Sequence, residues 1–241
     1  MQSIIDSIVY EFNRTFIRDQ RWYTFMTGFK NTCTITVVAV LIGIAIGIFV
    51  AMIHNLVTEG LNPKRQNFGT RLLRVLDKLL SAYVAVMRGT PLAIQLMIMA
   101  FIIMAGYSNK IVVCCIAFGV NSGAYVSEVI RGGLASVDKG QMEAGRSLGL
   151  TRMTCMRLIV LPQAMATILP ALCNEGIAVL KETSIVGLIA VVDLTRASDL
   201  VRSRTLSPYF PMISVAIVYF VLVFGLSKLV GRLEKRLARG R

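Results

Sequence analysis

A few charged side chains interrupt the apolar stretches of this chain and are the first candidates for chemistry. Arg88 stands just before Pro91, and Glu128 and Glu175 lie within long apolar runs. Ionisable groups in apolar surroundings are costly and by default indicate a function. Pro91 removes one helix hydrogen bond, so we expect the backbone beside Arg88 to kink and to open a polar-lined segment.

A purely structural interpretation of these charges stays open. Glu128 and Arg131 are three residues apart on one helix face and are able to pair with each other. The Arg88 side chain is long enough to extend from an apolar segment to the water at the edge of that segment. The polar residues of the same apolar segments either line one cavity or form hydrogen bonds between helices; they are Gln95, Asn121 and Tyr125.

A second candidate is the polar stretch KGQMEAGRSLGLT, residues 139–151, which lies between two apolar segments. Asp138 with Gln141 three residues later predicts a capping box, and Gly149 is able to end the helix in the left-handed conformation. Gly145 and Gly149 are four residues apart, so we expect them on one face, where another surface approaches the backbone closely. The alternative is an ordinary solvated loop helix.

The elements that position these residues are apolar helices. The chain has 241 residues, of which 55% are hydrophobic and only 16% are charged, with a mean hydropathy of +0.68. Several stretches approach or exceed the roughly 20 apolar residues that a spanning helix needs. We expect an all-α integral membrane protein with five transmembrane helices, at about 25–55, 81–106, 110–132, 155–180 and 209–231.

Charge distribution predicts the orientation of these spans. More than half of the 26 Lys and Arg fall in the segments 64–78, 131–157 and 228–241. If the chain crosses the membrane five times, these three segments lie on the same side of it. The positive-inside rule makes that side cytoplasmic. The N-terminus is therefore expected outside and the C-terminus inside.

Three segments are expected to be amphipathic or partly buried and not to span. Residues 1–24 carry apolar residues at helical spacing between charged ones, which predicts a retained interfacial helix. The leucine-rich part of 56–80 predicts a short cytoplasmic surface helix that leads into the second span. Residues 181–208 hold an apolar piece too short to cross, so we expect a re-entrant or outer-face gate. Residues 25–241 then form one transmembrane domain, with the polar loop at about 137–151.

Composition argues against several functions. The net charge of +13 lies beside apolar segments and lacks the interleaved aromatic residues of a nucleic-acid surface. One histidine leaves no material for a His-based metal site or triad, and the five cysteines include no CxxC pair. No GxxxxGK[ST] loop is present to hold a nucleotide. We therefore expect no catalytic residue, no metal and no cofactor bound by this chain.

A series of motifs in one order along the chain resembles the permease subunit of polar amino-acid ABC importers of the histidine, glutamine and arginine type. They are Gly28-x-x-Asn31-Thr32, Arg88-Gly89-Thr90-Pro91-Leu92 with Gln95, Asn121-Ser122-Gly123-Ala124-Tyr125 with Glu128, Arg131-Gly132-Gly133, Leu169-Pro170 with Asn174-Glu175, and Lys181-Glu182-Thr183-Ser184. Their joint order makes the resemblance specific. The 139–151 stretch resembles the EAA loop of these permeases, with Glu143-Ala144-Gly145 in place of Glu-Ala-Ala.

The resemblance implies the transmembrane fold of a type I ABC importer and a transport subunit that is not itself an enzyme. ATP and Mg²⁺ would bind a partner ATPase. The residues that would couple to that ATPase are Gln141, Glu143, Ala144, Gly145, Ser147, Leu148 and Gly149. Further implied partners are an extracellular or periplasmic binding protein, a second permease copy, identical or paralogous, and the lipid of the bacterial plasma membrane.

The resemblance also implies an amino-acid substrate, which needs donors for its carboxylate and acceptors for its ammonium. Arg88 is expected to serve the carboxylate and Glu175 or Glu128 the ammonium. The other pathway residues expected are Thr90, Gln95, Asn121 and Tyr125. The acidic residues favour a cationic or neutral polar substrate, while the particular amino acid stays open. The rival function is an ion-coupled secondary transporter, a class that often shows inverted repeats, and none is apparent.

Overall fold

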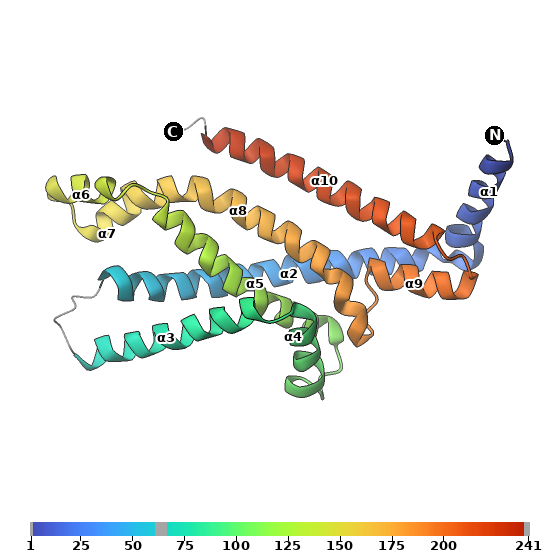
Figure 1. Cartoon of the computed structure of the whole chain (residues 1–241), viewed down its shortest axis with the longest axis horizontal. Helices are drawn as coiled ribbons and strands as arrows, with labels where there is room; N and C mark the ends of the chain where they lie inside the picture. Colours follow the sequence, from blue (N-terminus) through green and yellow to red (C-terminus); the bar gives the residue numbers. More distant parts are fainter. Residues whose placement is uncertain (1, 61–66, 239–241) are drawn as a thin grey trace.

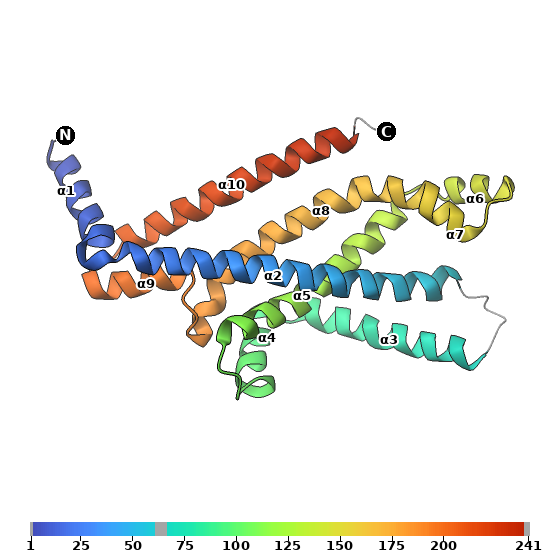
Figure 2. The same cartoon turned by 180° about the vertical axis from the view of Figure 1, so that it is seen from behind.

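The computed structural model describes residues 2–60 and 67–238, and every regular element in these ranges is helical. Four helical stretches in the described residues are long and apolar enough to cross a membrane: Trp22–Thr58, Lys110–Ala135, Arg152–Ile189 and Phe210–Leu237. Their main helices are α2 (Trp22–Asn55), α5 (Lys110–Ala135), α8 (Leu161–Glu182) and α10 (Phe210–Ala238). They match the first, third, fourth and fifth predicted spans. Figures 1 and 2 show an elongated helical assembly.

The second predicted span, 81–106, corresponds to two helices that meet at a sharp bend. α3 (Phe68–Gly89) and α4 (Leu92–Ile98), which continues as a π-helical turn to Ile103, are together long and apolar enough to cross a membrane but are bent by 112°. The surface helix predicted within 56–80 is not separate but forms the first part of α3, which packs beside α2 and α5 (Figure 1). The break lies at Thr90 and Pro91, where the proline predicted a kink.

The predicted orientation of the spans stays a prediction. In Figure 1 the N-terminus lies at one end of the long axis, and α10 runs towards the other end, as an odd number of crossings requires. Four of the basic residues that supported the orientation lie outside the described residues: Lys64, Arg65, Arg239 and Arg241.

α2 and α5 cross closely because small residues line their contact. A Cβ added to Gly43 of α2 would lie 2.8 Å from Ser122 Oγ, and one added to Gly47 would collide with Val126. Such small-residue contacts are typical of helix packing in membranes. The adjoining core joins α2, α4, α5, α8 and the 3₁₀ helix Thr183–Ile189, and its fully buried side chains include Ile35, Leu96, Val179 and Val186.

The segment between α8 and α10 folds back against other protein. The 3₁₀ helix Thr183–Ile189 buries Val186 and Ile189 in the core, and the chain then turns at Ala190, whose φ is 62°. α9 (Leu194–Thr205) follows. Val186 and Ile189 anchor the segment in the core, while Leu188 and Ala190 at its turn are exposed. Its role as a gate stays a prediction.

The Gly28-x-x-Asn31-Thr32 motif on α2 fixes this segment. Asn31 Nδ2 donates to the Val192 carbonyl at 2.8 Å. A Cβ at Gly28 would lie 2.5 Å from the Asp193 carbonyl oxygen, so glycine permits the close approach. The motif therefore has a structural task, which is to hold the start of α9 against α2.

Asp193 is fully buried and caps α9. Its carboxylate accepts from the N–H groups of Thr195 and Arg196 at 2.8 and 3.0 Å, and burial raises its pKa. We expect Asp193→Ala to lose the cap and to lower stability by about 1 kcal/mol, whereas Asp193→Asn keeps an accepting oxygen and stays close to wild type. Thermal unfolding in detergent measures both, and an equal loss in the two variants would contradict the capping role.

The N-terminal helix α1 (Gln2–Phe12) docks on the loop after α9. Glu11 accepts from Ser207 Oγ at 2.6 Å, and Arg14 donates to the Thr205 carbonyl. Ile8 and Phe12 are exposed, so an apolar face is available on this helix. The interfacial placement predicted for residues 1–24 stays a prediction.

Candidate coupling helix and transport pathway

The helix α6 (Lys139–Ser147) lies between α5 and the short helix α7 (Arg152–Cys155), at the end of the molecule opposite the N-terminus (Figure 1). Asp138 caps it and accepts from the Gly140 N–H at 2.7 Å. The predicted capping box is only half formed, because the Gln141 side chain turns to α8. There Gln163 Nε2 donates to Gln141 Oε1 at 3.5 Å.

The end of α6 confirms the prediction that Gly149 adopts the left-handed conformation. Gly149 has a φ of 83°. The Leu150 N–H donates to the Gly145 carbonyl at 3.2 Å, and the Gly149 N–H donates to the Arg146 carbonyl at 3.0 Å. This pair of bonds is the Schellman pattern, which satisfies the last carbonyls of a helix. The turn directs the chain back beneath α6 into α7.

The close approach predicted for Gly145 and Gly149 is found at Gly145 alone, and the approaching surface belongs to the same chain. A Cβ at Gly145 would lie 2.7 Å from Cys155 Sγ and 3.0 Å from Ile159 Cδ1, so this glycine is buried against its own chain. Gly149 has open space around its missing Cβ. Gly145 therefore seats α6 on the helix that follows it.

Most of the predicted coupling residues on and just after α6 are exposed, with Gln141 on the side towards α8; they are Gln141, Glu143, Ala144, Ser147 and Leu148. The Leu148 side chain is 83% exposed, and Met153 at the start of α7 is 62% exposed. Exposed apolar side chains close in sequence to an exposed acidic group fit a surface that another protein covers.

Side chains replace the backbone donors lost at the break between α3 and α4. Pro91 has no N–H, so the Met87 carbonyl, four residues earlier, lacks its helical donor. Gln95 Nε2 and Asn121 Nδ2 donate to that carbonyl at 2.9 and 3.2 Å. Gln95 also donates to Thr90 Oγ1 at 2.8 Å and accepts from Asn121 at 2.9 Å. Gln95 and Asn121 thus form the interhelical hydrogen bonds that were their structural alternative, and Thr90, another predicted pathway residue, joins them.

A charged cluster lies beside this network. Glu128 pairs with Arg88 at 3.1 Å and with Arg131 at 2.6 Å. The Arg88 guanidinium also lies 5.6 Å from the centre of the Tyr125 ring. The structure therefore brings together the predicted residues Arg88, Tyr125 and Glu128, and it also contains the Glu128–Arg131 pair expected from their spacing.

Glu175 belongs to neither group. It lies on α8 and accepts from Ser122 Oγ of α5 at 2.9 Å. Sequence reasoning assigned no role to Ser122, because a contact between α5 and α8 is visible only once the helices are packed. The predicted pathway residues thus form two groups and a separate carboxyl.

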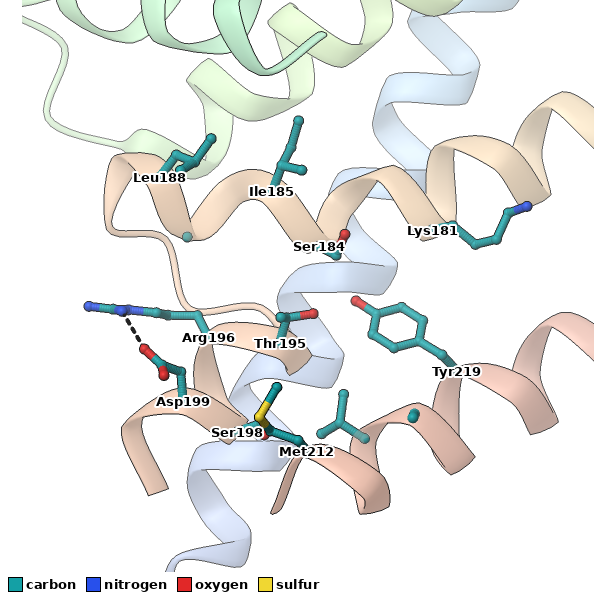
Figure 3. A pocket seen from close by; sticks show the side chains of 13 residues that line it. Lys181, Ser184, Ile185, Leu188, Thr195, Arg196, Ser198, Asp199, Met212 and Tyr219 are labelled. Carbon is teal, nitrogen blue, oxygen red and sulfur yellow. Dashed lines mark hydrogen bonds and ion pairs between the residues drawn. The ribbon is translucent and has the colours of Figure 1, made fainter. Parts of the chain in front are cut away.

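Sequence reasoning also missed a pocket and a histidine–aspartate pair. A pocket of about 670 Å³ opens between the Thr183–Ile189 helix, α9 and α10 (Figure 3). Arg196 pairs with Asp199 there at 2.8 Å, and the hydrogen bond from Arg202 lowers the pKa of Asp199. Between α2 and α3, His54 Nδ1 lies 2.9 Å from Asp77 Oδ1. In the part of the chain that the structure describes, no three His, Cys, Asp or Glu side chains gather as a metal site.

Apolar spanning helices, one span broken at a polar network and a short exposed helix at one end together define a multi-spanning membrane protein of the transporter class. The chain belongs to the family described as binding-protein-dependent transport system inner membrane component, whose model matches residues 68–239. It is therefore an inner-membrane permease subunit, as its motifs predicted.

Individual relatives agree with this assignment. The Bacillus subtilis arginine transport system permease protein ArtQ is 34% identical over 215 residues, covering 88% of this chain and 91% of its own. A Rickettsia bellii protein, provisionally named glutamine transport system permease protein GlnP, is 36% identical over 221 residues, with 87% and 91% covered. A crystal structure of an amino acid ABC transporter with histidines matches with a TM-score of 0.77 at 37% identity, covering 88% and 94%.

These similarities confirm the predicted permease function and the ABC importer fold. They lend no support to the alternative, an ion-coupled secondary transporter.

Proposed function

We propose that the chain lines the pathway of an importer for polar amino acids and that a partner ATPase drives it through α6. The observation that carries the proposal is the geometry of α6, whose outer face is exposed while Gly145 anchors its inner face. ATP and Mg²⁺ bind the partner, because this chain has no GxxxxGK[ST] loop. A second permease copy completes the pathway, and a binding protein delivers the substrate.

The anchoring of α6 explains how motion reaches the membrane. Gly145 fits against Cys155 and Ile159, so a force on α6 acts directly on the stretch Arg152–Ile189. That stretch carries Glu175 and its contact with α5. Closure of the ATPase shifts the population between two packings of the same helices, which face opposite sides of the membrane.

Binding of an amino acid would replace an ion pair within the chain by two ion pairs between the chain and the amino acid. Its carboxylate takes the Arg88 guanidinium and its ammonium takes Glu128 or Glu175, while Tyr125 offers a ring face to the cation. The Arg88–Glu128 pair supports this proposal, because a zwitterion presents the same two charges that the pair satisfies within the chain. The names of the relatives favour polar amino acids such as arginine and glutamine.

Crosslinking tests the docking of α6. Leu148→Cys is placed in a Cys33→Ser, Cys173→Ser background, which removes the partly exposed native thiols. A cysteine-to-amine crosslinker should join this chain to its ATPase. Leu206→Cys is the matched control, because Leu206 is 82% exposed against 83% for Leu148 and lies beyond α9. A crosslink from position 206 but not from 148 would overturn the proposal.

A further inference from the structure

An apolar groove of about 490 Å³ lies between α2, α8 and α10. Its lining includes Val40 and Leu41 from α2, Ile177 and Leu180 from α8, and Leu229 and Leu233 from α10. Figures 1 and 2 both show α10 diverging from α2 towards the C-terminal end of α10. Leu229 is 57% exposed although it faces this groove. The groove is therefore open to whatever surrounds the protein.

The groove face of α10 ends in basic residues. Leu226, Leu229 and Leu233 follow one another at helical spacing, and Arg236 takes the next place on that stripe. Arg232 lies on the flank of the stripe, and it and Arg236 are exposed. One end of an otherwise apolar groove thus carries at least two cations.

We infer that this groove binds an acyl chain of an anionic phospholipid and that Arg232 and Arg236 hold its head group. The chain is an inner-membrane protein, so lipid is the solvent of its apolar faces. Basic residues next to spanning helices attract anionic lipids, while the apolar lining suits a hydrocarbon chain. The apolar lining thus matches the acyl chain of an anionic phospholipid, and the basic end matches its head group.

Charge also argues against a second copy of this chain as the occupant of the basic end. The sequence has 26 Lys and Arg against 13 Asp and Glu, so another copy offers mainly like charge. Like charges brought together across an interface disfavour association. An anionic head group meets no such repulsion.

Photolabelling of the complete transporter in lipid nanodiscs tests the inference. Two probes carry a diazirine in the middle of an acyl chain, one a phosphatidylglycerol and the other a phosphatidylcholine. Peptide mapping should find the label on residues 226–233, with more from the phosphatidylglycerol. Neutralising Arg232 and Arg236 to Gln should reduce that preference by about fivefold per charge.

A pair of tryptophan variants tests the groove itself. Leu229→Trp fills it and should abolish labelling of 226–233 by both probes. Phe220→Trp is the control, because Phe220 is 66% exposed on the same helix and does not line the groove. Equal labelling by the two probes in the unmodified chain would overturn the head-group assignment. Unlabelled groove residues in the assembled transporter would show that a second copy fills the groove and would overturn the inference.

Discussion

Glu143→Lys is expected to leave the chain inserted in the membrane but to lower amino-acid-dependent ATP hydrolysis by about 30-fold, the loss typical of a central interface residue. Glu143 lies on the exposed face of α6. Reversal of its charge alters the surface offered to the ATPase and leaves the buried contact of Gly145 untouched. The measurement is ATPase activity of the reconstituted transporter, with Asp6→Lys as an equally large charge reversal on exposed α1.

Gly149→Asp is the companion variant. Gly149 has open space around it but a φ of 83°, where most side chains are strained and aspartate is among the better tolerated. We expect normal insertion, a weakened end of α6 and reduced coupling. Undiminished transport by both Glu143→Lys and Gly149→Asp would defeat the assignment of α6 as the coupling helix.

The second large effect is expected at the charged cluster. Arg88→Gln should raise the amino-acid concentration that half-maximally stimulates ATP hydrolysis by about tenfold, because it removes a charged hydrogen-bond donor. Arg131→Gln is the matched control, since it also removes a partner of Glu128 but was not predicted to contact substrate. Its effect should be small.

A combined variant separates binding from folding at this cluster. Arg88→Gln, Glu128→Gln and Arg131→Gln together remove all three members of the cluster, so neither ion pair leaves an unpaired charge behind. Stability should recover, while the loss of affinity should persist. Recovery of affinity in the triple variant, or equal losses for Arg88→Gln and Arg131→Gln alone, would contradict a substrate role for Arg88.

Spans and helix ends were largely predictable because they depend on local sequence. Apolar length located four spans, and Gly149 marked the end of α6 through a backbone preference that acts within a few residues. Pro91 likewise marked the break, since a proline leaves the carbonyl four residues earlier without a donor. The identity of the donors, Gln95 and Asn121, depends on how α4 bends and how α5 packs against the end of α3, which is not a local property.

The features that the sequence did not predict also depend on how the helices pack. Helical spacing placed Gly145 on a face but did not say which neighbour that face meets, and the neighbour is α7 and the turn after it. The merging of the surface helix into α3 and the size of the bend, 112°, appear only once α3 lies beside α2 and α5. The contact of Glu175 with Ser122 joins residues 53 positions apart.

The most direct test of the account is ATP hydrolysis by the transporter isolated through a tag on this chain and returned to lipid. It is assayed with its binding protein and with each polar amino acid in turn. We predict stimulation by a polar amino acid and loss of that stimulation in Glu143→Lys. A chain that purifies without ATPase activity, or whose stimulated activity is unchanged in Glu143→Lys, would contradict the account.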